Sequence, residues 1–166
     1  MKGFVPKEAL SKEGYIIDQR KLGNIFYGKY TSDYNGCGWI AAYNLLKLCG
    51  VSVEPEEVRS ALENSLRFGG KFGTFPFAIK KYLKKHLSVK MKVRSRKQLK
   101  KLCCGKGILL YWTGKSAHNA VFCGCEECKD KIRLLNDVCG KEQTVNTESF
   151  LAERMRFPLC LMFEVE

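Results

Sequence analysis

The chain has 166 residues, of which 45% are apolar and 28% charged, so it has the composition of a globular protein without low-complexity tracts or repeats. At this length we expect a single domain over residues 1–166 that needs no disulfides, because a chain of this size buries roughly 68–70% of its unfolded surface. No stretch approaches the ~20 apolar residues of a membrane span, and the first residues lack the apolar core of a signal peptide, which predicts a cytoplasmic protein with no membrane partner.

The net charge of +12 is concentrated in the middle of the chain. Residues 64–125 contain fifteen Lys or Arg and no Asp or Glu, whereas the remainder has 14 basic and 17 acidic residues. Such a basic face can attract an acidic partner, although a solvated helix surface gives the same pattern. Because no DNA- or RNA-binding motif accompanies the charge, we expect no nucleic acid partner.

The strongest helical pattern covers residues 37–48. Asn35 and Gly36 are turn formers before it, and Gly50 is a natural stop after it. Its apolar residues occupy much of the circumference, which predicts a central helix packed on more than one side. Weaker patterns before it predict a short helix at 5–12 and extended segments at 15–18 and 24–30.

Two more helices are expected before the middle of the chain. One begins near Pro55, with acidic residues in its first turn, and ends at 69–70, where two glycines follow each other. The other has Thr74 as its N-cap, Pro76 just inside, and Phe75 facing inward.

The pattern then changes from helical to extended. Residues 89–94 alternate apolar and basic side chains, which predicts a half-buried strand. Further expected elements are a helix at 96–104, strands at 107–112, 119–124, 131–137 and 159–166, and a helix that starts at Thr147. Helices followed by a mainly antiparallel sheet indicate an α+β fold.

Cys37 is the cysteine best placed to be a nucleophile. It lies at the start of the central helix, where free N–H groups and the helix dipole favour thiolate over thiol. The other cysteines differ: Cys49, Cys103 and Cys104 fall near helix C-termini, where the dipole disfavours a thiolate, and Cys160 lies in an apolar strand.

The chain has only two histidines, His86 and His118, so few residues qualify as a catalytic base. His86 is expected at the surface near a helix end. His118 opens a predicted strand, and a hairpin with its turn at 127–128 pairs residues whose numbers add to about 255, which sets His118 opposite Asp137. A register shift of one residue substitutes Asn136, and either side chain can orient an imidazole ring.

Cys37, His118 and Asp137, with Asn136 as the alternative third residue, thus form a candidate catalytic triad. The thiolate attacks an acyl carbon, the imidazole acts as base and acid, and the third residue orients the ring. The predicted function is a cysteine hydrolase that forms a thioester and needs no cofactor.

The order of these residues resembles that of the papain-like cysteine peptidases. YNGCGWIAAYNLLKLCG, SAHNAVF and LLNDVCG followed by TESFL are similar to the bacterial double-glycine leader peptidases, which process bacteriocin precursors, and to their free-standing relatives. The resemblance spans residues 35–150. It implies a papain-like fold, with a nucleophile-bearing helix packed on a mainly antiparallel sheet, and cleavage of a peptide or amide bond.

Two positions depart from the family pattern. The family places a glutamine six residues before the nucleophile as an oxyanion donor, and here Thr31 stands there, so Thr31 and Asn35 are the candidate donors. The residue after Asp137 is Val138, where the family has proline. Two alternatives remain open. An acyltransferase on the same fold would use an amine in place of water, and the sequence does not separate it from a hydrolase. The missing glutamine leaves open a weakly catalytic module that binds an acidic partner through its basic face.

A CxxC pair at residues 125–128, with Cys123 and Cys139 nearby, suggests a metal site. Structural zinc sites combine two such pairs, and only one is present. We therefore expect no metal there and free thiols instead.

Overall fold

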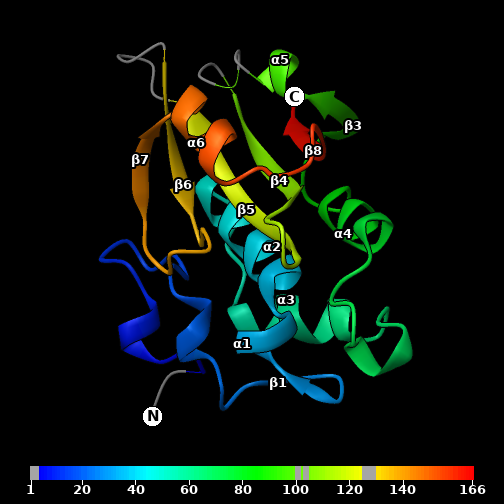
Figure 1. Ribbon diagram of the computed structural model, residues 1–166. Coiled ribbons are helices and arrows are strands. Elements are labelled where there is room, and N and C mark those ends of the chain that lie inside the picture. Colours follow the sequence, from blue (N-terminus) through cyan, green and yellow to red (C-terminus); the bar gives the residue numbers. More distant parts are fainter. Residues whose placement is uncertain (1–3, 100–101, 103–104, 125–129) are drawn as a thin grey trace.

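The computed structural model describes residues 4–99, 102, 105–124 and 130–166, and its fold is α+β, as the sequence predicts (Figure 1). The helices are α1 (Ser32–Asn35), α2 (Cys37–Leu48), α3 (Pro55–Glu63), α4 (Pro76–Leu83), α5 (Arg96–Leu99) and α6 (Thr147–Glu153), with short 3-10 turns η1 (Lys7–Ala9), η2 (Gln19–Lys21) and η3 (Phe68–Gly70). The strands are β1 (Phe26–Tyr27), β2 (Tyr30–Thr31), β3 (Val89–Ser95), β4 (Lys106–Trp112), β5 (Ala117–Gly124), β6 (Lys131–Leu135), β7 (Gln143–Asn146) and β8 (Leu159–Val165). None of the described helices is long and apolar enough to cross a membrane.

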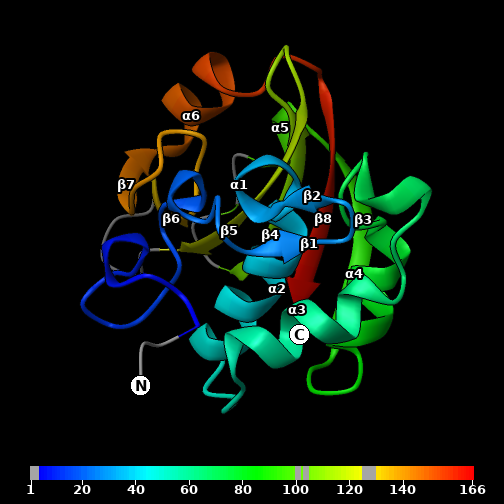
Figure 2. The same cartoon turned by 90° about the horizontal axis from the view of Figure 1, so that it is seen from below.

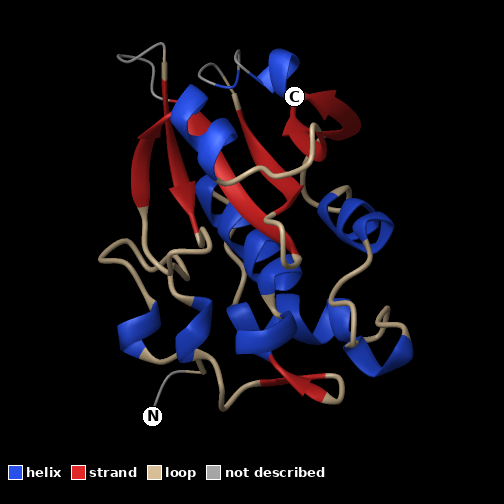
Figure 3. Ribbon diagram, in the orientation of Figure 1, coloured by secondary structure: helices blue, strands red, loops and turns tan. Residues whose placement is uncertain are grey.

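Strands β3 to β8 form one sheet in the order β3-β8-β4-β5-β6-β7, and every neighbouring pair is antiparallel. Figure 3 shows this sheet above the helical N-terminal part, while β1 and β2 make a separate small hairpin below. The antiparallel order allows short connections, so β4, β5 and β6 follow one another in the chain and in space.

The sheet lies between two helical layers, with α6 on one side and α2 and α3 on the other (Figure 2). On the α2 side, Ile108 and Val121 join the buried residues of α2 in the larger core cluster. On the α6 side, Leu109 and Phe122 pack with Phe150 in a second cluster. This alternation along β4 and β5 places successive side chains on opposite faces.

The central helix has the predicted bounds, and its residues from Gly38 to Leu46 are buried. The prediction for α3 was wrong at its end, because the helix stops at Glu63 well before the glycines. The Thr74 cap was also wrong: its hydroxyl hydrogen-bonds Tyr27 Oη at 2.7 Å, Phe75 is the residue before α4, and the Phe75 side chain is exposed.

The strand at 89–94 is confirmed as β3, although Val93 is exposed because β3 is the edge of the sheet. The last helix starts at Thr147 as predicted, since the Asn146 side chain accepts hydrogen bonds from the first-turn N–H groups. Strand β7 at the opposite edge was missed, because four mostly polar residues carry little periodic signal.

Candidate active site

The nucleophile candidate is set by a tight junction between two helices. Gly36 separates α1 from α2, and a Cβ atom there would lie 2.4 Å from the Ser32 carbonyl oxygen, so the junction requires glycine. Cys37 is the first residue of α2 and is half-buried. The first N–H groups of a helix have no intrahelical partner, so Cys37 lies where the backbone favours negative charge.

His118 is held beside it by the start of β5. The ring packs edge-on to Tyr111, its neighbour on β4, with centroids 5.9 Å apart. Its Nε2 lies 2.6 Å from the main-chain oxygen of Asn136. A carbonyl oxygen only accepts, so Nε2 carries a hydrogen and Nδ1 is the nitrogen left to exchange a proton with Cys37.

The predicted cross-strand partner of His118 was wrong. Strands β5 and β6 pair Val121 with Leu135, one residue away from the expected register, and their pairing stops before it reaches His118. Asn136 then leaves the strand with φ of 56°, a left-handed conformation that asparagine adopts more readily than most residues. The base is therefore oriented by a backbone carbonyl at this turn rather than by a side chain of the ladder.

Asp137 is buried close to the base, and its direct partner is a tyrosine. Its Oδ1 accepts a 2.7 Å hydrogen bond from Tyr111 Oη, and the charge of Asp137 helps raise the pKa of His118. The alternative residue, Asn136, uses its side chain elsewhere, with Oδ1 accepting from Gln19 N at 3.2 Å. Both residues predicted for the third position are thus at the site, but neither side chain is hydrogen-bonded to the imidazole.

Asn119 is a site residue that sequence reasoning missed. Its Nδ2 lies 3.4 Å from Cys37 Sγ, and the residue is buried on the α2 side of the sheet. Its Oδ1 has no hydrogen-bond partner within the described part of the chain. The signal available in the sequence was the alternation along β5, which puts Asn119 on the same face as Val121, a core residue that packs with the central helix.

The two titrating groups of the site stabilise each other's charged form. Burial raises the pKa of the Cys37 thiol, but hydrogen bonds to His118 and Asn119 and the imidazolium charge outweigh this, so the pKa lies below its usual value. Burial lowers the pKa of His118, but its hydrogen bond to Cys37 and the thiolate charge raise it above its usual value. Both shifts favour a thiolate–imidazolium pair over a neutral thiol and imidazole.

Gln19 is the second residue that was missed. It lines the same cavity of about 220 Å³ as Cys37 and His118, and its Nε2 donates to the Asp33 main-chain oxygen at 2.9 Å. Its Oε1 accepts from Asn136 Nδ2 at 3.3 Å. The expected spacing of six residues before Cys37 does not predict Gln19, because Gln19 lies much further from Cys37 in the sequence and reaches the site from η2.

The two predicted oxyanion donors are placed less well. Asn35 donates through Nδ2 to the main-chain oxygens of Tyr27 and Gly70, at 2.9 Å each, which uses both amide hydrogens. Thr31 lies in β2 and lines neither cavity that contains Cys37. Neither side chain has the geometry of a donor at Cys37.

Removing the Asn119 amide tests its contact with the thiolate. Asn119→Ala should raise the pKa of Cys37 and slow its alkylation by chloroacetamide near pH 6 by about tenfold, because a hydrogen bond to the charged form is lost. The measurement is the alkylation rate of Cys37 against pH by mass spectrometry. The exposed Asn64→Ala serves as a control, and an unchanged Asn119→Ala profile would contradict the assignment.

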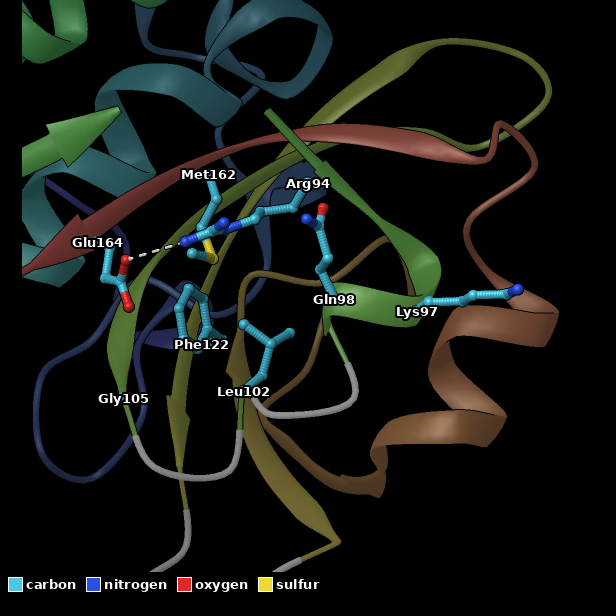
Figure 4. A pocket seen from close by; sticks show the side chains of 8 residues that line it. All are labelled: Arg94, Lys97, Gln98, Leu102, Gly105, Phe122, Met162 and Glu164. Atoms are coloured by element: carbon cyan, nitrogen blue, oxygen red, sulfur yellow. Dashed lines mark ion pairs between the residues drawn. The ribbon is translucent and has the colours of Figure 1, made fainter. Parts of the chain in front are cut away.

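A hollow that does not contain Cys37, of about 520 Å³, lies on the sheet face turned away from α2 (Figure 4). Phe122, Leu102 and Met162 supply its apolar lining, and the Arg94 guanidinium points toward Glu164, 3.9 Å away. No described residue that lines it is a cysteine or histidine. It therefore offers no nucleophile or base.

Of the cysteines considered for metal binding, Cys125 and Cys128 lie outside the described residues, and Cys123 contacts the Gly124 carbonyl. In the part of the chain that the structure describes, no three His, Cys, Asp or Glu side chains are grouped to hold an ion. The predicted surface position of His86 is confirmed, since it is exposed in the turn after α4.

No family model matches the chain, and no curated protein is significantly similar to it.

Proposed function

We propose that the chain is a papain-like cysteine hydrolase that cleaves a peptide or amide bond through a thioester intermediate. The observation that carries the proposal is the pairing of a cysteine at a helix N-terminus with a histidine whose far nitrogen is fixed 2.6 Å from a backbone oxygen. The nucleophile-bearing helix packed on an antiparallel sheet is also in keeping with a papain-like arrangement.

In the first half-reaction the Cys37 thiolate attacks the carbonyl carbon and forms the C–S bond. The C–N bond then breaks as the His118 imidazolium gives its proton to the departing amine. In the second half-reaction a water molecule attacks the thioester while His118 takes one of its protons. The acid is released and the thiolate–imidazolium pair is restored, so atoms and charge balance over the cycle.

The negative charge on the carbonyl oxygen needs donors during both steps. The Cys37 main-chain N–H is at the helix start, and we assign the side-chain amide of Gln19 as the second donor. One of its two hydrogens bonds Asp33 O, which leaves the other for the substrate. Preorganised donors of this kind act where charge develops and need no rearrangement.

Asp137 and Asn136 divide the supporting role. The main-chain oxygen of Asn136 fixes the ring of His118, and the buried carboxylate of Asp137 stabilises the imidazolium charge from behind. Tyr111 holds the carboxylate in place through its hydroxyl. Asp137, which was predicted to orient His118, is therefore assigned the role of stabilising the imidazolium charge.

The decisive experiment is to map cysteine reactivity with chloroacetamide across pH. We expect Cys37 to react fastest and to stay reactive below the pH at which ordinary thiols lose their thiolate, because its pKa is lowered. Cys49 is a matched internal control, since it is also half-buried but burial raises its pKa. If Cys37 reacts no faster than Cys49 and Cys139, the protein is not a thiolate enzyme. The result would then favour the alternative of a module that binds an acidic partner.

A further inference from the structure

A third cavity, separate from the hollow in Figure 4, is lined by Cys37 but not by the base His118. It measures about 520 Å³. The residues that line both this cavity and the smaller one of about 220 Å³ are Asp33, Tyr34, Cys37, Ser116 and Ala117. Only the smaller cavity is also lined by His118. The two hollows thus form one cleft that crosses the thiolate.

The position of the acid fixes which part of a substrate enters which hollow. The departing amine must receive its proton from His118, so it lies in the smaller cavity. The acyl part of the substrate stays on the cysteine and extends the other way. The larger cavity therefore receives the acyl side.

Aromatic side chains from three separate elements line this acyl-side cavity. Tyr34 is 62% exposed, Phe72 73% and Trp112 45%, which is unusual for such large apolar groups around one hollow. Tyr34 is stacked on Tyr30, with ring centroids 5.2 Å apart, so its position is supported from behind. A bulky apolar side chain of a substrate would cover this surface.

The loop that carries Phe72 is held against the central helix. Thr74 lies so close to Gly38 that a Cβ atom on the glycine would be 2.6 Å from it, and its hydroxyl bonds Tyr27. The adjacent Gly73 has φ of 67° and lines the cavity. The wall is thus anchored one residue from the nucleophile.

The charge of the cavity is positive at two points. Lys71 and Lys115 line it, and neither has an ion-pair partner among the described residues. Both belong to the acid-free segment 64–125, and among the described residues Asp33 is the one acidic side chain in the lining. The Lys71 ammonium lies 5.9 Å from the ring centroid of Phe72. A carboxylate on the acyl side of a substrate would thus meet two ammonium groups that form no described ion pair.

We propose that this cavity selects peptides whose acyl side carries a bulky apolar side chain next to an acidic residue. The inference rests on the proposed hydrolase function, which supplies the direction of the substrate. The cavity combines three aromatic walls with two lysines that form no described ion pair, and the inference assigns part of the basic excess of the chain to substrate recognition.

Peptidyl acyloxymethyl ketones test the preference directly, because the Cys37 thiolate displaces their carboxylate and forms a stable C–S bond. The probes are acetyl-Asp-Phe-Gly and acetyl-Phe-Asp-Gly ketones, each with Phe replaced by Ala or Asp replaced by Lys. In the better of the two orders, we expect the second-order labelling rate to fall at least about tenfold without Phe. Replacing Asp by Lys should lower it about fivefold.

Variants assign the preference to the cavity. Trp112→Ala and Phe72→Ala should weaken the preference for Phe. Phe77→Ala should not, because Phe77 lies outside the cavity and its exposure of 65% falls between those of the other two residues. The double change Lys71→Gln with Lys115→Gln should remove the preference for Asp, whereas the exposed Lys84→Gln should not. Chloroacetamide makes no contact with the acyl side, so its rate at Cys37 should be the same in all of them.

Two results would overturn the inference, and they differ in what else they affect. The first result is a labelling rate that does not depend on the acyl sequence of the probe, or a preference that remains in the cavity variants. If chloroacetamide still labels Cys37 rapidly, this result refutes the specificity alone. Slow labelling of Cys37 by chloroacetamide refutes the hydrolase and the specificity together.

Discussion

His118→Ala should lower the hydrolysis of peptide bonds by roughly 10²–10⁴, the range of general acid–base catalysis. Without the imidazolium, the Cys37 pKa rises, because hydrogen bonding and charge from His118 are the largest influences that offset burial, ahead of the hydrogen bonds from Asn119. The departing amine also loses its proton donor. An activated ester such as p-nitrophenyl acetate should be affected less, since its phenolate leaves without a proton.

The comparison needs two substrates and one control variant. Amine release from casein peptides reports the amide reaction, and p-nitrophenolate release reports the ester. His86→Ala is the matched control because His86 is the only other histidine and is exposed. Equal losses for amide and ester would show that His118 activates the thiol without protonating the leaving group, and full activity in His118→Ala would exclude it as the base.

Gln19→Ala should lower peptide turnover by roughly 10²–10³, the cost of losing one oxyanion donor. Chloroacetamide alkylation passes through no tetrahedral oxyanion, so Cys37 should react with it almost as in the unmodified protein. A structural disturbance would instead slow both reactions, because Gln19 also bonds Asn136, whose carbonyl orients His118.

The measurement is the kcat for casein peptides together with the alkylation rate. Gln98→Ala is a suitable control, since Gln98 lines the hollow on the other face of the sheet and is remote from Cys37. Turnover that is unchanged in Gln19→Ala would remove Gln19 from the reaction and leave the Cys37 N–H as the assigned donor.

The sequence is sufficient to predict the parts of the site that depend on local signals. The helix that begins at Cys37 follows from its turn formers and apolar circumference, and the strand that begins near His118 follows from an apolar run. Both signals lie within a few residues of the group they position. The α+β class follows from the order of such segments along the chain.

The contacts that the sequence did not predict all depend on distant or irregular backbone. The carbonyl that holds His118 belongs to Asn136 in a left-handed conformation, and no side-chain pattern predicts where a main-chain oxygen points. The register of β5 and β6 was missed by one residue, because the side-chain pattern within the two strands does not by itself fix their register. Gln19 comes from a 3-10 turn near the N-terminus, for which the chain has no periodic signal.

The site brings together two groups that are distant in the sequence. Cys37 lies on α2 and His118 on the sheet, more than eighty positions later. The two groups lie on different elements, so the unusual reactivity of the thiol exists only while the helix is docked on the sheet. Chloroacetamide labelling of Cys37 is accordingly a built-in probe of the native state. Along a urea titration, its rate should fall to that of an ordinary cysteine as the domain unfolds, at the same point at which buried Cys160 first becomes reactive.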